Sequence, residues 1–440
     1  MSDPRGGAGR SRSELPAAYW WLWVSILVNR LGGFVVPFLA LYLTTERGFS
    51  AAYAGLVAAL YGLGGSVAAV AGGVLADRLG RRTTLLAASL AAAATTATLG
   101  FVTQPVVIAV VAGAVGLTAN ASRPAVSAMM VDLVRPEQRV RAYSLNYWAI
   151  NVGFAVSGAV AGLIAERTYL WLFLGDALMT ALCAVVVFAR VPETGPVAHG
   201  PVEGGARTGI GQVWRDRRFM ALVGLTFLLG SVLQQAFTTL PIDMSEAGLT
   251  ASDYGRVLAL NGLLVVVLQL PASRWAAGRE PVARLSFGAL LLGWGFGVTA
   301  VAGGDSRAGT LWLYAASVAV WTLGEIVHEP ASMAAAAELS PPRARGRYQG
   351  VYTLAASASA SASAFCGPAA GGAVLDLYGS TAVWGACAVV GTVTAAGYWL
   401  LLRRGKGATA EAGPGATAGP DDVGRTLEGR SADDGNHSDV

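Results

Sequence analysis

Long apolar stretches recur along the whole chain and alternate with short connections that are rich in arginine. One crossing of a lipid bilayer requires about 20 consecutive apolar residues. The spacing predicts twelve crossings, over residues 17–43, 51–75, 83–102, 106–133, 143–165, 169–189, 219–242, 253–275, 283–302, 310–336, 348–374 and 381–402. The pattern therefore predicts an all-α polytopic membrane protein.

The composition excludes most other classes of protein. Of the 440 residues, 54% are apolar and only 13% are charged, whereas a soluble domain carries about 25% charged residues. So little polar surface cannot cover a water-soluble body of this size, which argues against an ordinary soluble enzyme. The 57 glycines fit transmembrane helices whose backbones approach closely.

The positive charges fall mainly on one side of the predicted membrane. If the N-terminus is cytoplasmic, most of the 31 lysines and arginines lie in cytoplasmic connections. The opposite side then carries only Arg47, Arg167, Arg256 and Arg307. Cytoplasmic loops are enriched in Lys and Arg, so we expect both termini in the cytoplasm and the protein in the inner or plasma membrane of the cell.

The longest internal connection divides the chain into two halves. We expect a cytoplasmic N-terminus over 1–16, six-helix bundles over 17–189 and 219–402, and a polar linker over 190–218 between them. The tail over 403–440 is rich in Gly, Ala, Asp and Ser, which predicts disorder.

The two halves repeat each other. One set of residues recurs 200 positions later: Gly48, Gly55, Gly62 and Leu63 match Gly248, Gly255, Gly262 and Leu263. A second set recurs 206 positions later: Pro124, Asp132, Leu133, Pro136, Arg139 and Arg141 match Pro330, Glu338, Leu339, Pro342, Arg345 and Arg347. A parallel repeat of this kind predicts a substrate site between the halves, near the bilayer midplane.

One motif follows the second predicted helix. Residues 73–85 read G-V-L-A-D-R-L-G-R-R-T-T-L, which resembles the signature of the major facilitator superfamily. The resemblance implies two six-helix bundles around a central cavity and a latch that closes the cytoplasmic side. The latch would contain Gly73, Asp77, Arg78, Gly80, Arg81 and Arg82, with Asp132 as a further acidic partner. A simpler interpretation is that these arginines only fix the topology.

A weaker motif lies in the eleventh predicted helix. Gly367, Pro368, Gly371 and Gly372 form a G-P-x-x-G-G pattern, which is similar to a motif of drug/proton antiporters. Those antiporters carry it in helix 5, whereas helix 5 of this chain contains no proline between Gly158 and Gly162. Small residues that allow close helix packing explain the pattern equally well.

Polar residues inside membrane spans are candidates for function because they are costly to bury there. The resemblance implies that helices 1, 4, 7 and 10 line the cavity. The candidate cavity residues are Asn29, Arg30, Arg123, Asn151, Gln234, Gln235 and Asn261. Asp176, nearer the outer end of helix 6, is interpreted as structural.

The tenth predicted helix has the densest polar cluster. Glu325, His328 and Glu329 are three and four residues apart, and we expect all three side chains to point roughly the same way. Burial and proximity of like charges raise carboxylate pKa values, so the cluster suits proton coupling. A divalent cation site is disfavoured because the membrane spans offer no second histidine or suitable cysteine.

Arg123 and Glu329 occupy equivalent positions in the two halves and carry opposite charges. We expect them to pair when the cytoplasmic side is closed and to separate when it opens. The alternative is that each is paired permanently within its own half.

These observations predict a secondary active transporter that works by alternating access. The preferred function is proton-coupled export of small, hydrophobic, drug-like molecules. The alternatives are proton-coupled import of a small anionic, sugar or peptide solute and, less favoured, a membrane sensor. The sequence has no nucleophile–base constellation and no nucleotide-binding loop, so we expect no enzymatic activity. The expected partners are the substrate, protons and the bilayer, for a monomer without cofactor or nucleic acid.

Overall fold

The computed structural model describes residues 15–135, 138–194, 216–276, 279–301, 306–338 and 345–410. Residues 1–14, most of the expected linker and residues 411–440 lie outside this part. The described residues form helices and short connections, with no strand among them.

The first half of the chain forms one helical bundle. Its helices are α1 (Ala17–Leu31), α2 (Val35–Leu41), the π-helical η1 (Tyr42–Glu46), α3 (Ala51–Leu79), α4 (Arg81–Phe101), α5 (Pro105–Leu133), α6 (Arg139–Ala165) and α7 (Leu170–Arg190).

The second half forms the other bundle. Its helices are α9 (Arg217–Leu233), the 3-10 helix η3 (Gln234–Phe237), α10 (Thr239–Glu246), α11 (Ala251–Ala276), α12 (Pro281–Gly297), the 3-10 helix η4 (Val298–Val301), α13 (Arg307–Glu338), α14 (Arg345–Tyr378) and α15 (Ser380–Ala410).

Eleven helical stretches among the described residues are long and apolar enough to span a bilayer. Helix α14 is a further long helix of 34 residues, and the described helices confirm the predicted all-α architecture of two six-helix bundles. Helix α15 continues to Ala410, so the first residues of the segment expected to be disordered are helical.

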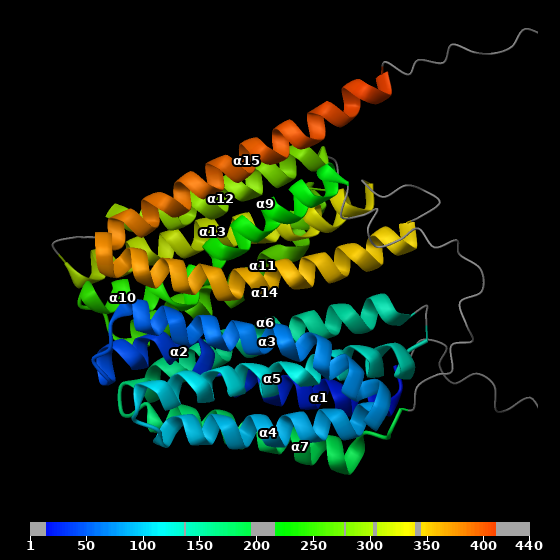
Figure 1. Cartoon of the computed structure of the whole chain (residues 1–440), viewed down its shortest axis with the longest axis vertical. Coiled ribbons are helices and arrows are strands. Elements are labelled where there is room, and N and C mark those ends of the chain that lie inside the picture. The colour runs from blue at the N-terminus through cyan, green and yellow to red at the C-terminus, as the bar shows by residue number, and fades with distance from the viewer. Residues whose placement is uncertain are drawn as a thin grey trace, which may run out of the picture.

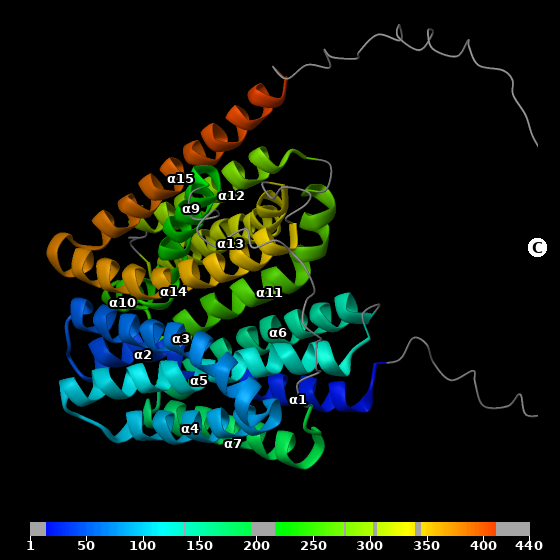
Figure 2. The same ribbon diagram turned by 45° about the vertical axis from the view of Figure 1, so that its right-hand side comes forward.

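The two bundles lie against each other with their helices running in the same general direction (Figures 1 and 2). We call the side on which α1 begins and α15 ends the terminal side, and the opposite side the distal side. The principal contacts between the bundles join α3 to α14 and α6 to α11. We call these two contacts the seams.

Glycines bring the backbones together in the distal half of each seam. A side chain at Gly55 of α3 would clash with the carbonyl oxygen of Pro368 in α14. In the other seam, a Cβ atom at Gly255 of α11 would lie 3.0 Å from Gly162 Cα in α6. Gly55 and Gly255 are equivalent in the repeat, so the two halves use the same position to pack against each other.

The first spanning helix of each bundle is interrupted near its middle. Residues 17–43 were expected to form one helix, but it is broken at Gly32–Phe34, between α1 and α2. Two consecutive glycines have low helix propensity, which explains the position. Asp176 of α7 accepts a hydrogen bond from the backbone N–H of Val35, the first residue of α2, at 3.2 Å. This contact supports the interpretation that Asp176 has a structural role.

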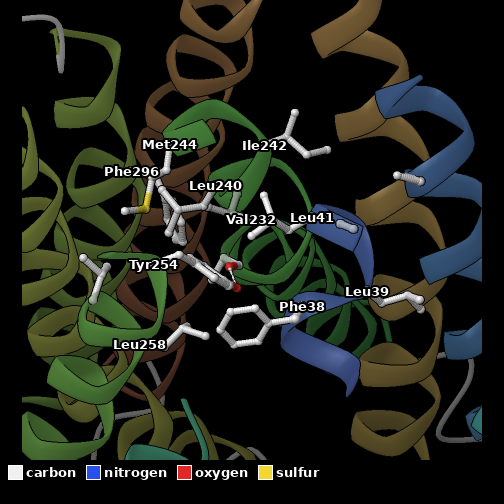
Figure 3. Close-up of a cluster of buried hydrophobic side chains, with 14 of the residues drawn as sticks. Phe38, Leu39, Leu41, Val232, Leu240, Ile242, Met244, Tyr254, Leu258 and Phe296 are labelled. Atoms are coloured by element: carbon white, nitrogen blue, oxygen red, sulfur yellow. Dashed lines mark hydrogen bonds between the residues drawn. The ribbon is translucent and has the colours of Figure 1, made fainter. Parts of the chain in front are cut away.

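The second bundle has a matching interruption, since the 3-10 helix η3 separates α9 from α10. Figure 3 shows that α2 and α10 contribute to an apolar cluster between the bundles. In it the rings of Phe38 and Tyr254 meet edge to face with centroids 5.1 Å apart. The Tyr254 hydroxyl donates to the Ala236 carbonyl at 2.9 Å. This cluster and the two seams close the distal side.

Candidate functional site

A large cavity lies between the bundles and toward the terminal side. Its volume is about 1260 Å³. The wall is formed by the first half of α1, the first half of α6 and the second half of α11. Small-molecule sites usually occupy about 300–1,000 Å³, so this cavity can hold a drug-sized molecule with room to spare.

The lining of this cavity is mainly aromatic and apolar. The rings of Trp23 and Trp148 stack at a centroid distance of 6.3 Å, and Trp20 meets Trp23 edge to face. The Trp23 indole N–H donates to the Leu145 carbonyl at 3.0 Å, which fixes the ring. Such a wall favours ligands with aromatic or aliphatic surface.

Several polar side chains, two of them arginines, also line the cavity. Asn151, predicted from the sequence, lines it, and its amide donates to the Tyr147 carbonyl at 2.9 Å. Tyr147 lies close enough to Glu325 and Glu329 for their charges to act on its hydroxyl.

The first bundle presents two arginines to a separate polar cavity of about 120 Å³. Arg30 of α1 and Arg123 of α5 line it together, beside Asn29 and Asp176. Asn29 donates to the Thr180 hydroxyl at 3.2 Å. Within the described part of the chain, neither arginine lies at ion-pair distance from a carboxylate.

The second bundle carries the acidic residues of α13. Glu325 is half-buried and accepts a hydrogen bond from the Asn261 amide at 3.4 Å. The same amide donates to the Thr322 hydroxyl at 3.0 Å. Glu329, four residues further on, is exposed. Asn261 is thus a direct partner of a glutamate at a predicted proton site.

His328 does not share the position of the two glutamates, which corrects the expectation that all three point the same way. Its ring is buried inside the second bundle, and Nε2 lies 3.0 Å from the Tyr398 hydroxyl of α15. Gly288 of α12 packs directly against it. Three residues correspond to about 300° of helix rotation, so the offset of about 60° is enough to turn His328 into the bundle.

Gln234 and Gln235 also differ in position, since one lines a cavity and the other is buried inside the second bundle. Gln234 lines a small cavity of about 70 Å³ beside Pro368. Gln235 is buried, and its amide donates to the Gly367 carbonyl at 2.8 Å. It therefore lies outside the cavity that we predicted it to line, and joins η3 to α14 instead.

The glycine motif of α14 makes these contacts possible. A side chain at Gly371 would clash with the Gln235 amide, and one at Gly372 would clash with Ala51 of α3. Gly371 thus packs against the motif's own bundle, and Gly372 packs against the other bundle. The structure supports the helix-packing interpretation of this sequence.

The predicted latch lies on the terminal side, at the connection between α3 and α4. Arg81 forms an ion pair with Asp132 at the end of α5, so this pair lies within one bundle. Asp77 and Arg78 are exposed, and the space beside Gly73 is open. Arg82 donates to the Phe188 carbonyl, and Gly80 makes the turn with φ +90°.

Three acidic residues with specific partners escaped the sequence interpretation. Asp243 of α10 is buried and accepts from the Tyr314 hydroxyl at 2.7 Å and the Trp384 indole at 2.9 Å. Glu193 accepts from two backbone N–H groups at the start of α4, and Asp376 does so at the start of α3. Glu193 and Asp376 bind at the starts of helices. In the sequence, each is recognisable only as a carboxylate near a predicted helix boundary.

The sequence model of the family described as "Major Facilitator Superfamily" matches residues 22–364 and 244–427. The "Multidrug resistance protein MdtH" of Cronobacter sakazakii (strain ATCC BAA-894) is 29% identical over 338 residues, which cover 76% of this chain and 82% of that protein. The "Uncharacterized MFS-type transporter YqjV" of Bacillus subtilis (strain 168) is 26% identical over 370 residues, covering 82% of this chain and 87% of that protein.

Solved structures share the fold. The nucleoside transporter NupG superimposes with a TM-score of 0.72 and 16% identity, covering 88% of this chain and 100% of that chain. A POT family transporter in complex with a thioalcohol-conjugated peptide gives a TM-score of 0.73 and 16% identity, covering 90% and 97%. At this level of identity the likeness shows the fold alone.

Proposed function

The chain belongs to the major facilitator superfamily, and from this premise we propose that it is a proton-coupled exporter of hydrophobic, drug-like molecules. In this proposal the terminal side is the cytoplasmic side, in agreement with the arginine-rich connections found there. The structure then represents an inward-facing state, with the cavity open to the cytoplasm and the distal, extracellular side closed.

The observation that carries the proposal is the wide aromatic cavity on the cytoplasmic side. It offers Trp20, Trp23 and Trp148 for contact, beside Arg139, Arg141 and several neutral polar side chains that can orient a ligand. A site built this way selects for apolar surface more than for one hydrogen-bonding pattern. The name "Multidrug resistance protein" of several relatives that are 25–29% identical agrees with such a site.

Glu325 is the proposed proton carrier. It lies half-buried on α13, where the Asn261 amide can hold its ionised form. Glu329 is exposed one helical turn closer to the cytoplasm and can pass protons to it or from it. A carboxylate inside a membrane span is costly, which favours a transport function over a purely structural one.

The two arginines of the first bundle favour a second candidate, import of a small anionic solute. Arg30 and Arg123 line one cavity and have no ion-pair partner among the described residues. Two unpaired cations in a polar cavity are suited to bind a carboxylate or a phosphate.

Inverted membrane vesicles with an acidic interior can separate the two candidates. Their interior corresponds to the cell exterior, so an antiporting exporter should accumulate aromatic amines inside. A proton-coupled importer should instead empty vesicles that were preloaded with an aromatic carboxylate. The exposed acid Glu46 gives a matched control, since Glu46→Gln should leave either activity unchanged. No movement of either probe above that of vesicles without the protein would contradict both candidates.

A further inference from the structure

An unusual contact closes the seam between α3 and α14. Asp376 lies near the end of α14 in the second bundle, and α3 belongs to the first bundle. Asp376 Oδ1 accepts a hydrogen bond from the Ala51 backbone N–H at 3.0 Å, and Oδ2 accepts from the Ala52 N–H at 2.7 Å. One carboxylate therefore binds both of the first two N–H groups of a spanning helix that belongs to the other bundle.

The equivalent helix of the second half does not need such a partner. Helix α11 has an acid in its own first turn, and Asp253 Oδ2 accepts from the Thr250 N–H at 3.0 Å. Helix α3 has no acid in its first turn, because Tyr53 stands at the position equivalent to Asp253. The helix N-terminus attracts a negative charge, and in α3 that charge comes from the opposite bundle.

The positive partner of Asp376 is the N-terminus of α3. Among the described residues, no arginine or lysine lies at ion-pair distance from it. Its charged neighbour is the acid Glu246 of α10, whose pKa is raised by burial and by the charges of Asp243 and Asp376. The contact between Asp376 and α3 is therefore a specific bond between the two bundles and one that a single charge controls.

We propose that Asp376 is an extracellular gate residue, whose bond to the start of α3 holds the inward-facing state and must break before the exporter opens outward. The inference rests on the proposed function for the assignment of the distal side as extracellular. Alternating access requires the bundles to part on that side, and a bond that joins α14 to α3 cannot survive their separation. A bond within one bundle would persist through the cycle.

The other seam has a weaker counterpart. Glu166 lies just after α6 of the first bundle, beside the start of α11 in the second. Ser252 and Thr250 at the start of α11, together with the charge of Arg256, lower the pKa of Glu166. Each seam thus places a carboxylate of one bundle at the first turn of a helix in the other. Since α11 also has Asp253, we assign the controlling gate function to Asp376 alone.

The test measures extracellular access without any transport substrate. The native Cys183, Cys366 and Cys387 are replaced by serine or alanine, and a single cysteine replaces Leu39, which is 4% exposed behind the seam. A membrane-impermeant maleimide is then applied from outside the cell. Asp376→Asn keeps the shape but removes the charge, and should raise the alkylation rate about fivefold.

A matched control is available in α9. Asp216 accepts from the N–H groups of Arg218 and Phe219 at 3.0 and 3.2 Å, but it caps its own helix. Asp216→Asn should leave the alkylation rate at Leu39→Cys unchanged. The double change Asp376→Asn plus Tyr53→Asp gives α3 an acid of its own, as in α11. The single change Tyr53→Asp is its control, because it measures the effect of losing the hydrogen bond from Tyr53 to Pro105.

The double change distinguishes a gate from a simple helix cap. If Asp376 is a gate, the double variant should regain thermal stability while alkylation stays fast, because the bundles are still not joined. If the double variant returns to the slow alkylation of the parent, or if folded Asp376→Asn never alkylates faster, the proposal is overturned. Because no substrate is used, the absence of export would contradict the proposed function and leave this result standing.

Discussion

The two bundles share one backbone plan but carry opposite charges at their centres. Both have an interrupted first helix, and both place a glycine, Gly55 or Gly255, at the seam. The first bundle presents Arg30 and Arg123, whereas the second presents Glu325 and Glu329. The repeat thus preserves packing and changes chemistry.

This difference separates two requirements of a transporter. Two similar bundles can rock against each other about matched seams, because equivalent glycines give equivalent contacts. A proton carrier needs an acid on one side, and it needs that acid to be affected by charges that move relative to it. An exchange of charges between the bundles should therefore harm coupling more than it harms the fold.

The largest expected effect is the loss of the acid from the second bundle. Glu325→Gln keeps the Asn261 contact geometry but cannot carry a proton, so substrate binding should persist while gradient-driven accumulation falls at least tenfold. Inverted vesicles measure accumulation, and equilibrium binding of the same substrate measures affinity. The buried histidine supplies the contrast, since His328→Gln should change stability more than coupling. If Glu325→Gln vesicles still concentrate substrate with the pH gradient, Glu329 becomes the next candidate.

A charge exchange tests whether the two bundles act on each other directly. Arg123 and Glu329 form no ion pair among the described residues, as expected if they pair only when the cytoplasmic side is closed. Arg123→Glu and Glu329→Arg should each abolish transport, and the double exchange should recover part of it. Recovery would arise because the pair can form again when the cytoplasmic side closes. Labels on α5 and α13 should also approach each other in that state. A constant distance between the labels, together with no recovery of transport, would refute the pairing of Arg123 with Glu329.

The comparison also shows what sequence can predict. Hydrophobic length predicted the helices, and the repeat predicted two matching halves. The interruption at Gly32–Phe34 was missed because two glycines inside an apolar run look like ordinary packing residues. His328 and Gln235 were misplaced because helical spacing fixes a direction but not which neighbouring helix lies there.

A smaller effect is expected at the latch, where the two halves again differ. Asp77 is exposed in this state, and we expect it to find partners only when the cytoplasmic ends of the bundles approach. Asp77→Asn should therefore favour the inward-facing state and reduce turnover severalfold with little change in affinity. Alkylation of cysteines at the cytoplasmic mouth measures the shift. The corresponding connection of the second half lacks the acid, so Arg274→Gln should leave accessibility unchanged. Unchanged accessibility in Asp77→Asn as well would argue against the latch.

The smallest expected effect concerns external pH and the two carboxylates that flank the seams. Ser252 and Thr250 lower the pKa of Glu166, so its contact with α11 is present at neutral pH and is lost only as the pH falls through that lowered value. Burial and the neighbouring acids raise the pKa of Glu246, so Glu246 takes up a proton at higher pH than Glu166 does. An ordinary glutamate has a pKa of about 4.3, so Glu166 stays ionised between pH 7 and pH 5. The alkylation rate of Leu39→Cys is measured over this range, relative to a reference thiol at each pH. Any pH-dependent change in this rate should disappear in Glu246→Gln and persist in Glu166→Gln. A pH effect that vanished only in Glu166→Gln would reverse this order and show that Ser252 and Thr250 at the start of α11 do not hold the charge of Glu166.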